Sequence, residues 1–316
     1  MKPPISQNDI LSRLHALIHS TDDGRRLALI RIALGLIVLI ETLIHLPYTL
    51  ELYSNLGFHQ GQWPAPPPWL AYTFVIAALV GAAMITLGWR TRTALLAIFV
   101  IRAYLLGVDS INEKAASSLI LVLILTLLFS EAGKCWSIDA KVAKSSSNLS
   151  VSKLPLYYLQ FHFAQMYFFA GIVKMLHPEW PSGVALSRIL LSRWSTDWGT
   201  YIGLSLPIEG MRLLSLATIV FEITAPWLLF FSKARFFVIP LGLAFHLGIQ
   251  MSLSVGTLGP LFWLALILIF PSAETILSRV SKLENMVTHM KRLHVSWSYR
   301  GQISRKSLGS YFKGLW

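Results

Sequence analysis

The segment from Tyr157 to Trp180 reads YYLQFHFAQMYFFAGIVKMLHPEW and decides the fold class of this chain. Its aromatic and aliphatic residues form an apolar run long enough to cross a bilayer, which takes about 20 residues. Within the run lie Gln160, His162, Gln165 and Lys174. A polar side chain at membrane depth needs a buried partner or a function. The segment is therefore predicted to be a membrane helix and is the first place to look for a site.

The composition of the whole chain supports the same class. Of its 316 residues, 54% are hydrophobic and only 13% are charged, and the mean hydropathy is +0.59. Soluble proteins carry about 25% charged residues, so this chain is typical of an integral membrane protein. The net charge of +12 comes mainly from short basic connections and tails. There, Lys and Arg set the topology and contact anionic lipids, and they do not indicate nucleic acid.

Eight apolar segments are expected to span the bilayer, which predicts an all-α integral membrane protein, a polytopic bundle with amphipathic interfacial helices. The third and fourth segments are short, so seven or nine spans are the alternatives. The transmembrane domain covers residues 27–270, between an N-terminal interfacial helix within residues 1–26 and a basic amphipathic tail over residues 271–316. The eight segments are Leu27–Leu46, Leu70–Gly88, Thr93–Val108, Ser117–Phe129, Pro155–Leu176, Met211–Phe231, Phe236–Ser252 and Ser254–Phe270.

The basic residues of the connections predict the orientation of the bundle. Pairs such as Arg90 and Arg92, or Lys233 and Arg235, stand at alternate connections, whereas residues 47–68 contain no Lys or Arg. Connections rich in Lys and Arg lie in the cytoplasm. We therefore expect a multi-pass protein of the cell membrane with both termini in the cytoplasm. Its partners are then the lipid bilayer and a lipid-soluble substrate; no protein partner is indicated.

Some ionisable side chains lie inside the predicted spans, away from their cytoplasmic ends. A charge at the bilayer centre costs at least about 2.5 kcal/mol, so each needs a partner or a function. One interpretation is structural pairing, for example of an acid with the arginine. The other is a shared cavity in which a desolvated, neutral lysine amine accepts a proton, which an ammonium locked to a carboxylate cannot do. The five residues are Glu41, Arg102, Lys174, Glu222 and His246.

Metal chemistry is not indicated by the histidine spacing. The one HxxxH pair, His15 with His19, lies on the predicted interfacial helix with no third ligand nearby. Zinc sites need three or four closely placed protein ligands. The single cysteine, Cys135, also rules out a CxxC motif and an internal disulfide. No metal site is predicted.

Four ordered blocks of the sequence resemble the horizontally transferred transmembrane (HTTM) domain. Residues 167–174, YFFAGIVK, followed by Glu179 and Trp180, are similar to the YFxAGxxK…(D/E)W signature of that domain. The domain forms the membrane part of vitamin K-dependent gamma-glutamyl carboxylase and occurs in many bacterial proteins. The other three blocks are WSID at 136–139, FEITAP at 221–226 and AFH at 244–246.

The resemblance implies roles for particular residues. In the carboxylase, the lysine of the signature deprotonates vitamin K hydroquinone, and the histidine of the FH block is required near it. Lys174 is thereby the candidate base and His246 its partner, with Glu222 at the acidic position of the family. Tyr167 and Trp180, together with Arg102 in the third span, are the candidate substrate-binding residues. The implied cofactor or substrate is a membrane quinol.

The sequence also departs from the carboxylase. The carboxylase has a lysine pair in its signature, whereas Val173 precedes Lys174 here, and its large extracytoplasmic portion has no counterpart in these residues. The expected function is therefore that of a small membrane enzyme, carboxylase-like or quinol-oxygenase-like, acting on a quinol or another lipid-soluble substrate. The alternative is a non-catalytic membrane protein of maturation, transport or immunity. Gln160, His162 and Gln165 are interpreted as hydrogen-bonding groups between helices.

Overall fold

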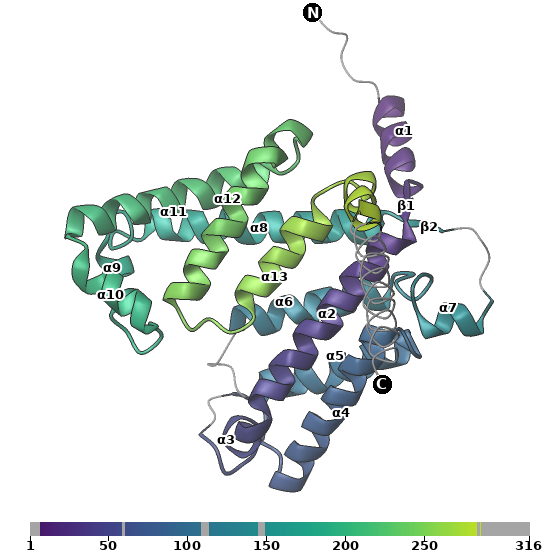
Figure 1. The fold of residues 1–316 in the computed structure, drawn as a ribbon, viewed down its shortest axis with the longest axis horizontal. Coiled ribbons are helices and arrows are strands. Elements are labelled where there is room, and N and C mark those ends of the chain that lie inside the picture. Colours follow the sequence, from purple (N-terminus) through teal and green to yellow (C-terminus); the bar gives the residue numbers. More distant parts are fainter. Residues whose placement is uncertain (1–6, 59–60, 109–113, 145–148, 283–284, 286–316) are drawn as a thin grey trace, which may run out of the picture. The chain divides into compact units, whose positions relative to one another are not determined.

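The protein divides into two compact units in its computed structural model. The model describes residues 7–58, 61–108, 114–144, 149–282 and 285. The first unit, Met1–Pro271, holds nearly all the described elements, and the second is Ser272–Trp316. Helices make up most of the first unit (Figure 1). The predicted fold class is therefore confirmed in its coarse form, as a mainly helical membrane protein.

Five helices in the described ranges are long and apolar enough to cross a membrane. The first is a 30-residue stretch, Gly24–Tyr53, which consists of α2 (Gly24–His45), a 3-10 turn (Leu46–Tyr48) and α3 (Thr49–Tyr53). These lengths meet the requirement of about 20 residues per span, so the chain is a multi-pass membrane protein. The other four helices are α4 (Pro68–Leu87), α5 (Thr91–Val108), α11 (Ile208–Leu228) and α12 (Ser232–Ser252).

The predicted count of eight spans is not confirmed, although each of the eight segments contains a helix. α6 (Lys114–Leu128) has 15 residues, about 22 Å of helix, which is short of a hydrocarbon core of about 30 Å. α8 (Leu154–Leu176) has 23 residues, but its Gln, His and Lys side chains lower its hydropathy. The last segment is divided into α13 (Leu258–Leu264) and a π-helical turn (Ala265–Ile269). It is long and apolar enough to cross a membrane only if it is counted together with the helix Ala273–Lys282.

Shorter helices lie outside the candidate membrane spans, one of them in the predicted N-terminal interfacial region. α1 (Gln7–Ile18) is the predicted N-terminal amphipathic helix, and its Leu11, Leu17 and Ile18 are exposed. The long connection after α8 holds two helices, α9 (Val184–Leu190) and α10 (Asp197–Ser205). The remainder of the predicted tail helix, beyond Lys282, falls almost wholly outside the described residues.

A small antiparallel sheet, absent from the all-α prediction, fixes the start of α2. Strands β1 (Thr21–Asp23) and β2 (Ser150–Ser152) pair with Asp22 opposite Val151. The Asp23 side chain caps α2 by accepting a hydrogen bond from the backbone N–H of Arg25. Gly24 is required at the junction, since a Cβ there would come within 3.0 Å of Cys135 Sγ and the Leu149 carbonyl oxygen.

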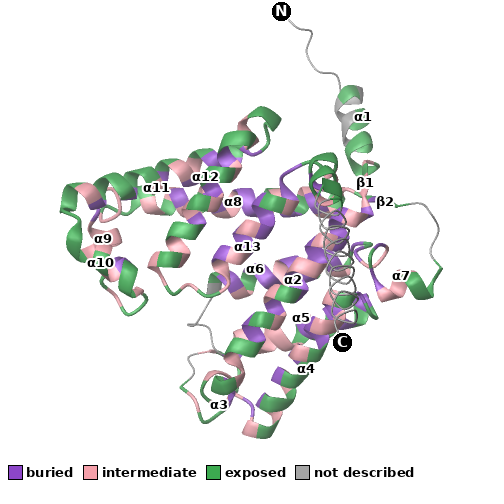
Figure 2. Ribbon diagram, viewed as in Figure 1, coloured by how far each residue is buried: buried purple, intermediate pink, exposed green. Residues whose placement is uncertain are grey.

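One apolar core joins α2, α6, α8 and α13. Its members alternate along each helix with exposed residues that face outwards (Figure 2). α8 and α11 pack closely at Gly171, because a Cβ there would lie 2.7 Å from Ile223 Cγ1 and 3.0 Å from Glu222 Cβ. Small residues permit such close approach of membrane helices. Fully buried members of the core include Leu34, Leu119, Leu123, Phe163 and Leu261.

A buried guanidinium holds the end of α4 and the loop after α6 against α2. Arg31 of α2 is fully buried. It donates hydrogen bonds to the carbonyl oxygens of Ile85, Thr86, Ala132, Cys135 and Trp136, at 2.6 to 3.5 Å. Buried carbonyl groups need donors, and a guanidinium offers five N–H groups in one plane.

Asp139, the last residue of the WSID block, caps α5. It lies in α7 (Ile138–Val142), and its carboxylate accepts hydrogen bonds from the backbone N–H groups of Arg90 and Thr91, at 2.7 and 2.8 Å. The Thr91 hydroxyl donates a third at 2.7 Å. These contacts satisfy donors at the start of the helix that have no partner within it. The WSID block therefore has a structural role in this chain.

Replacing Asp139 with asparagine is expected to lower the free energy of unfolding by about 1 to 2 kcal/mol at neutral pH. Burial alone would raise the pKa of Asp139, but the hydrogen bonds from Thr91 and Arg90 hold it below its ordinary value of 3.8. A carboxyl group whose pKa is lowered by folding stabilises the folded state at pH values above its ordinary pKa. That contribution is lost as the pH falls through the pKa of the folded state. Unfolding measured from pH 7 down to pH 3 should show a smaller acid-dependent loss of stability in Asp139→Asn than in the wild type.

Candidate functional site

Lys174 and Glu222 form a buried ion pair between α8 and α11. The Lys174 Nζ lies 2.8 Å from Glu222 Oε1 and 2.6 Å from Oε2, so one ammonium binds both oxygens. The two side chains are 19% and 9% exposed, respectively. The close packing at Gly171, one turn before Lys174, brings the two helices near enough for this contact.

Trp180 also contacts the ammonium group. The centre of its ring lies 5.2 Å from the Lys174 Nζ, within the range of a cation–π interaction. The Trp180 carbonyl accepts a hydrogen bond from the fully buried Ser215 of α11, which fixes this residue against the helix. The Lys174 Nζ therefore contacts both a carboxylate and an aromatic ring.

A second polar pair, Tyr167 with His246, lies on the same face of α8. The Tyr167 hydroxyl is 2.6 Å from His246 Nε2, and both residues are 3% exposed. The His246 ring stacks on Phe262 of α13, with 4.3 Å between the ring centres. Tyr167, Gly171 and Lys174 follow the four-plus-three spacing of one helix face. This face of α8 therefore carries both polar pairs.

The structure brings some predicted site residues together and keeps others apart. Lys174 contacts Glu222 and Trp180, while His246 contacts Tyr167. Within the described ranges, no hydrogen bond or ion pair joins Lys174 to His246. His246 belongs to α12 and reaches α8 at Tyr167, whereas Lys174 lies seven residues further along α8 and pairs with Glu222 of α11.

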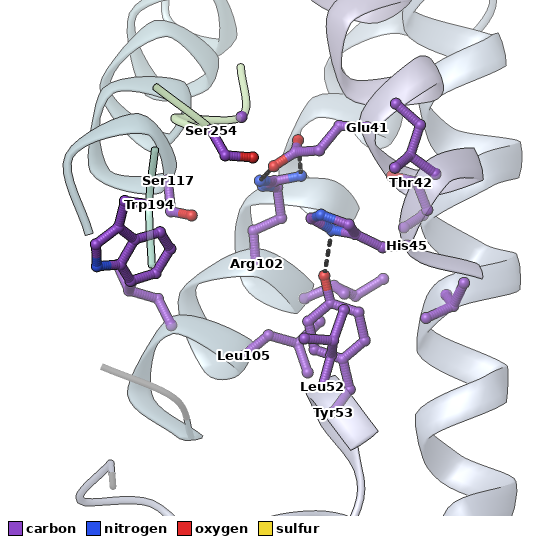
Figure 3. A pocket seen from close by; sticks show the side chains of 16 residues that line it. Glu41, Thr42, His45, Leu52, Tyr53, Arg102, Leu105, Ser117, Trp194 and Ser254 are labelled. Atoms are coloured by element: carbon purple, nitrogen blue, oxygen red, sulfur yellow. Dashed lines mark hydrogen bonds and ion pairs between the residues drawn. The ribbon is translucent and has the colours of Figure 1, made fainter. Parts of the chain in front are cut away.

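Arg102 belongs to a different cluster, which lines a cavity of about 400 Å³ (Figure 3). Its Nη2 donates a hydrogen bond of 2.9 Å to Glu41 Oε1, and its Nη1 lies 2.8 Å from Oε2 as an ion pair. Figure 3 shows Ser117, Ser254 and Trp194 around this guanidinium. The volume is that of a small-molecule site, but none of Lys174, Glu222 and His246 is among the lining residues.

The sequence reasoning identified Glu41 and Arg102 but missed their neighbours. His45 follows Glu41 by one helical turn, and its Nδ1 lies 3.0 Å from the Tyr53 hydroxyl in the same cavity. The four-residue spacing from Glu41 was the available signal, because it places both side chains on one helix face. Tyr53 carried no such signal, since its position depends on the turn that follows α2.

Of the three other polar residues of α8, one bonds between helices as interpreted and the other two bond within α8. Gln160 does bond between helices, from its Nε2 to the carbonyl oxygen of Ile269 at 2.8 Å. His162 and Gln165 instead contact each other, with 3.0 Å between His162 Nδ1 and Gln165 Nε2. They are three residues apart on one helix, so each side chain is the hydrogen-bond partner of the other. The inter-helix interpretation is therefore wrong for this pair.

Ligand groups for a metal ion are not gathered in the described part of the chain. No set of three or more His, Cys, Asp or Glu residues there is arranged to hold an ion. Each buried acid is instead paired with a base, Glu41 with Arg102 and Glu222 with Lys174.

Comparison with family models identifies the domain. A model described as the HTTM domain matches residues 19–274, from just before β1 to just after the π-helical turn. The chain belongs to the HTTM family. The match contains both polar pairs and the cavity, and it supports a relation to the membrane domain of the carboxylase. A search of curated proteins and a search of solved structures each found no match.

Within this HTTM domain, the four sequence blocks have two kinds of structural role. WSID holds the turn between α4 and α5, as described above. YFFAGIVK and FEITAP supply Lys174 and Glu222, and AFH supplies His246 against Tyr167. One block therefore has a capping role, whereas the other three supply buried polar side chains.

Proposed function

We propose that this HTTM protein is a membrane enzyme that binds a quinol, or a similar weakly acidic and lipid-soluble molecule, and transfers a proton at the Lys174–Glu222 pair. The observation that carries the proposal is the pair itself, enclosed between α8 and α11. A buried ion pair contributes little more to stability than apolar packing of the same volume. Its presence within membrane-spanning helices is therefore better explained by function.

The proton chemistry begins within the pair. As an ammonium, the Lys174 Nζ has no lone pair and cannot accept a proton. Transfer of one proton from Nζ to the Glu222 carboxylate produces a neutral amine beside a neutral acid, a state that burial favours over separated charges. The amine then takes the proton of a substrate hydroxyl, which leaves an ammonium and a substrate anion. Glu222 keeps its proton during this step.

The surroundings of Nζ suit a flat, apolar substrate. The Trp180 ring already lies against the ammonium group, and an aromatic substrate can stack on the same ring. Tyr167 and His246 form a hydrogen-bonded pair along the same helix face, which we propose orients the substrate without contacting Nζ. In this proposal, Lys174 faces the outer leaflet and both termini are cytoplasmic, as the distribution of Lys and Arg indicates.

The proposal predicts that binding of menadione to the purified protein in detergent depends on the pair. Quenching of tryptophan fluorescence measures the affinity. Replacing both partners, as Lys174→Met with Glu222→Met, should weaken binding at least about tenfold, equivalent to 1.4 kcal/mol. Lys233→Met is the control, because Lys233 is an exposed lysine at the start of α12.

Two outcomes would separate the candidate functions. Weaker binding in the double variant and unchanged binding in the control would support the quinol proposal. Equal binding in all three proteins would contradict it and leave the pair as a structural link between α8 and α11. That second result favours the non-catalytic alternative, a membrane protein of maturation, transport or immunity, because both Glu222 oxygens are then satisfied by a purely structural contact.

A further inference from the structure

Two hollows adjoin where α5 begins and α6 ends. The first, of about 560 Å³, is lined by Arg90, Arg92 and Lys134 among other residues. The second, of about 430 Å³, is lined mainly by apolar side chains of α6 and the start of α8. Both include Ser130 and Glu131. The two hollows therefore adjoin at these residues, and we call them together the depression, with a polar half and an apolar half.

The polar half presents positive charge. The side chains of Arg90 and Arg92 are exposed at its edge. Asp139 also lines it, but its carboxylate accepts the three hydrogen bonds that cap α5. Glu131 lies 3.3 Å from the Lys134 Nζ and is balanced by it. With Asp139 counted as one negative charge, the two exposed arginines still leave the polar half with a net positive charge.

The apolar half continues along surfaces that face lipid. Phe129, at the end of α6, is 79% exposed, and Leu154 and Tyr158 of α8 are also exposed. Trp89, beside Arg90, is 49% exposed. Exposed Trp and Tyr residues at the ends of membrane helices mark the level of the lipid headgroups. The depression therefore crosses from headgroup level into the region of the acyl chains.

We propose that this depression binds one anionic phospholipid. The phosphate lies at Arg90 and Arg92, where guanidinium groups offer paired N–H donors. One acyl chain lies in the apolar half, against Phe129 and Leu154. Basic pockets next to membrane helices recognise anionic headgroups in this way, because charge and hydrophobic burial act together. The proposal is independent of any reaction at Lys174.

The test uses the full chain in detergent and measures its thermal unfolding with added lipid. Dioleoylphosphatidylglycerol should raise the unfolding midpoint by roughly 3 to 5 °C more than dioleoylphosphatidylcholine does. Replacing both arginines, as Arg90→Gln with Arg92→Gln, should weaken the apparent affinity for phosphatidylglycerol at least about tenfold. The matched control is Lys141→Gln with Lys144→Gln, two exposed basic residues of the connection between α6 and α8 that do not line the depression.

Further ligands distinguish a lipid from a free anion. Inorganic phosphate and dihexanoylphosphatidylglycerol should each raise the midpoint much less than the long-chain lipid, because neither fills the apolar half. Three results would each overturn the proposal: equal shifts with both dioleoyl lipids, an unchanged affinity in the arginine variant, or a full shift with phosphate alone. If the control variant lost affinity as strongly as the arginine variant, general surface charge would be the cause, and the proposed site would be wrong.

Discussion

Replacing Lys174 with methionine is expected to lower the free energy of unfolding by about 3 kcal/mol. The change leaves the Glu222 carboxylate buried between α8 and α11 with neither of its two contacts to Nζ. A buried charge without a partner is far costlier than a neutral apolar group in the same place. The measurement is unfolding in mixed micelles of mild detergent and dodecyl sulfate, followed by circular dichroism.

Two further variants test whether the loss comes from the unpaired charge. Adding Glu222→Met to Lys174→Met should restore most of the stability, because the cavity between the helices then contains only apolar groups. Removing the exposed pair of Arg188 and Glu179, as Arg188→Gln with Glu179→Gln, should cost less than about 1 kcal/mol. A double variant as unstable as Lys174→Met would show that the lysine stabilises the helices by packing and not through its charge.

The stability result also bears on the proposed chemistry. If the double variant folds well, the pair is not needed to hold α8 against α11, and the close packing at Gly171 suffices. The pair would then be retained at no benefit to stability, as expected of a functional site. The menadione experiment on the same variant tests binding directly, so the structural and functional roles are measured on one protein.

The positions of the helices were predictable from the sequence because apolar runs and turn residues are local signals. Each of the eight apolar segments contains a helix, but the number that span was not predictable by the same means. α8 shows why: it has enough residues, and its polar side chains lower its hydropathy. The strands β1 and β2 lie far apart in sequence and have only three residues each, so no periodic pattern could indicate them.

The members of the site were easier to predict than their partners. The buried ionisable residues were identified because placing a charge inside a bilayer costs free energy. The pairing of Glu41 with Arg102 was among the expected alternatives. A Lys174 ammonium held by Glu222 was one of the alternatives that the sequence left open, since the contact depends on how closely α8 approaches α11. The resemblance predicted His246 beside Lys174, whereas in the structure the His246 ring contacts Tyr167 and Phe262.

Arg31→Lys is expected to lower the free energy of unfolding by at least about 4 kcal/mol. The guanidinium of Arg31 bonds to five carbonyl oxygens from the end of α4 and from residues 132–136. A lysine has three donors on one atom and cannot reach all of these acceptors. The carbonyl groups left without donors are buried, and each carries a cost.

A second readout follows from Cys135, whose carbonyl is one of these acceptors. Burial raises the pKa of its thiol, so the group is largely protonated and unreactive at neutral pH. Loss of the guanidinium contacts should loosen residues 132–136 and speed maleimide labelling of this cysteine, the only one in the chain. Arg92→Lys, at an exposed arginine, should change neither stability nor labelling. Slow labelling and full stability in Arg31→Lys would mean that this loop is held by its other contacts, including the hydrogen bonds of Asp139 to the start of α5.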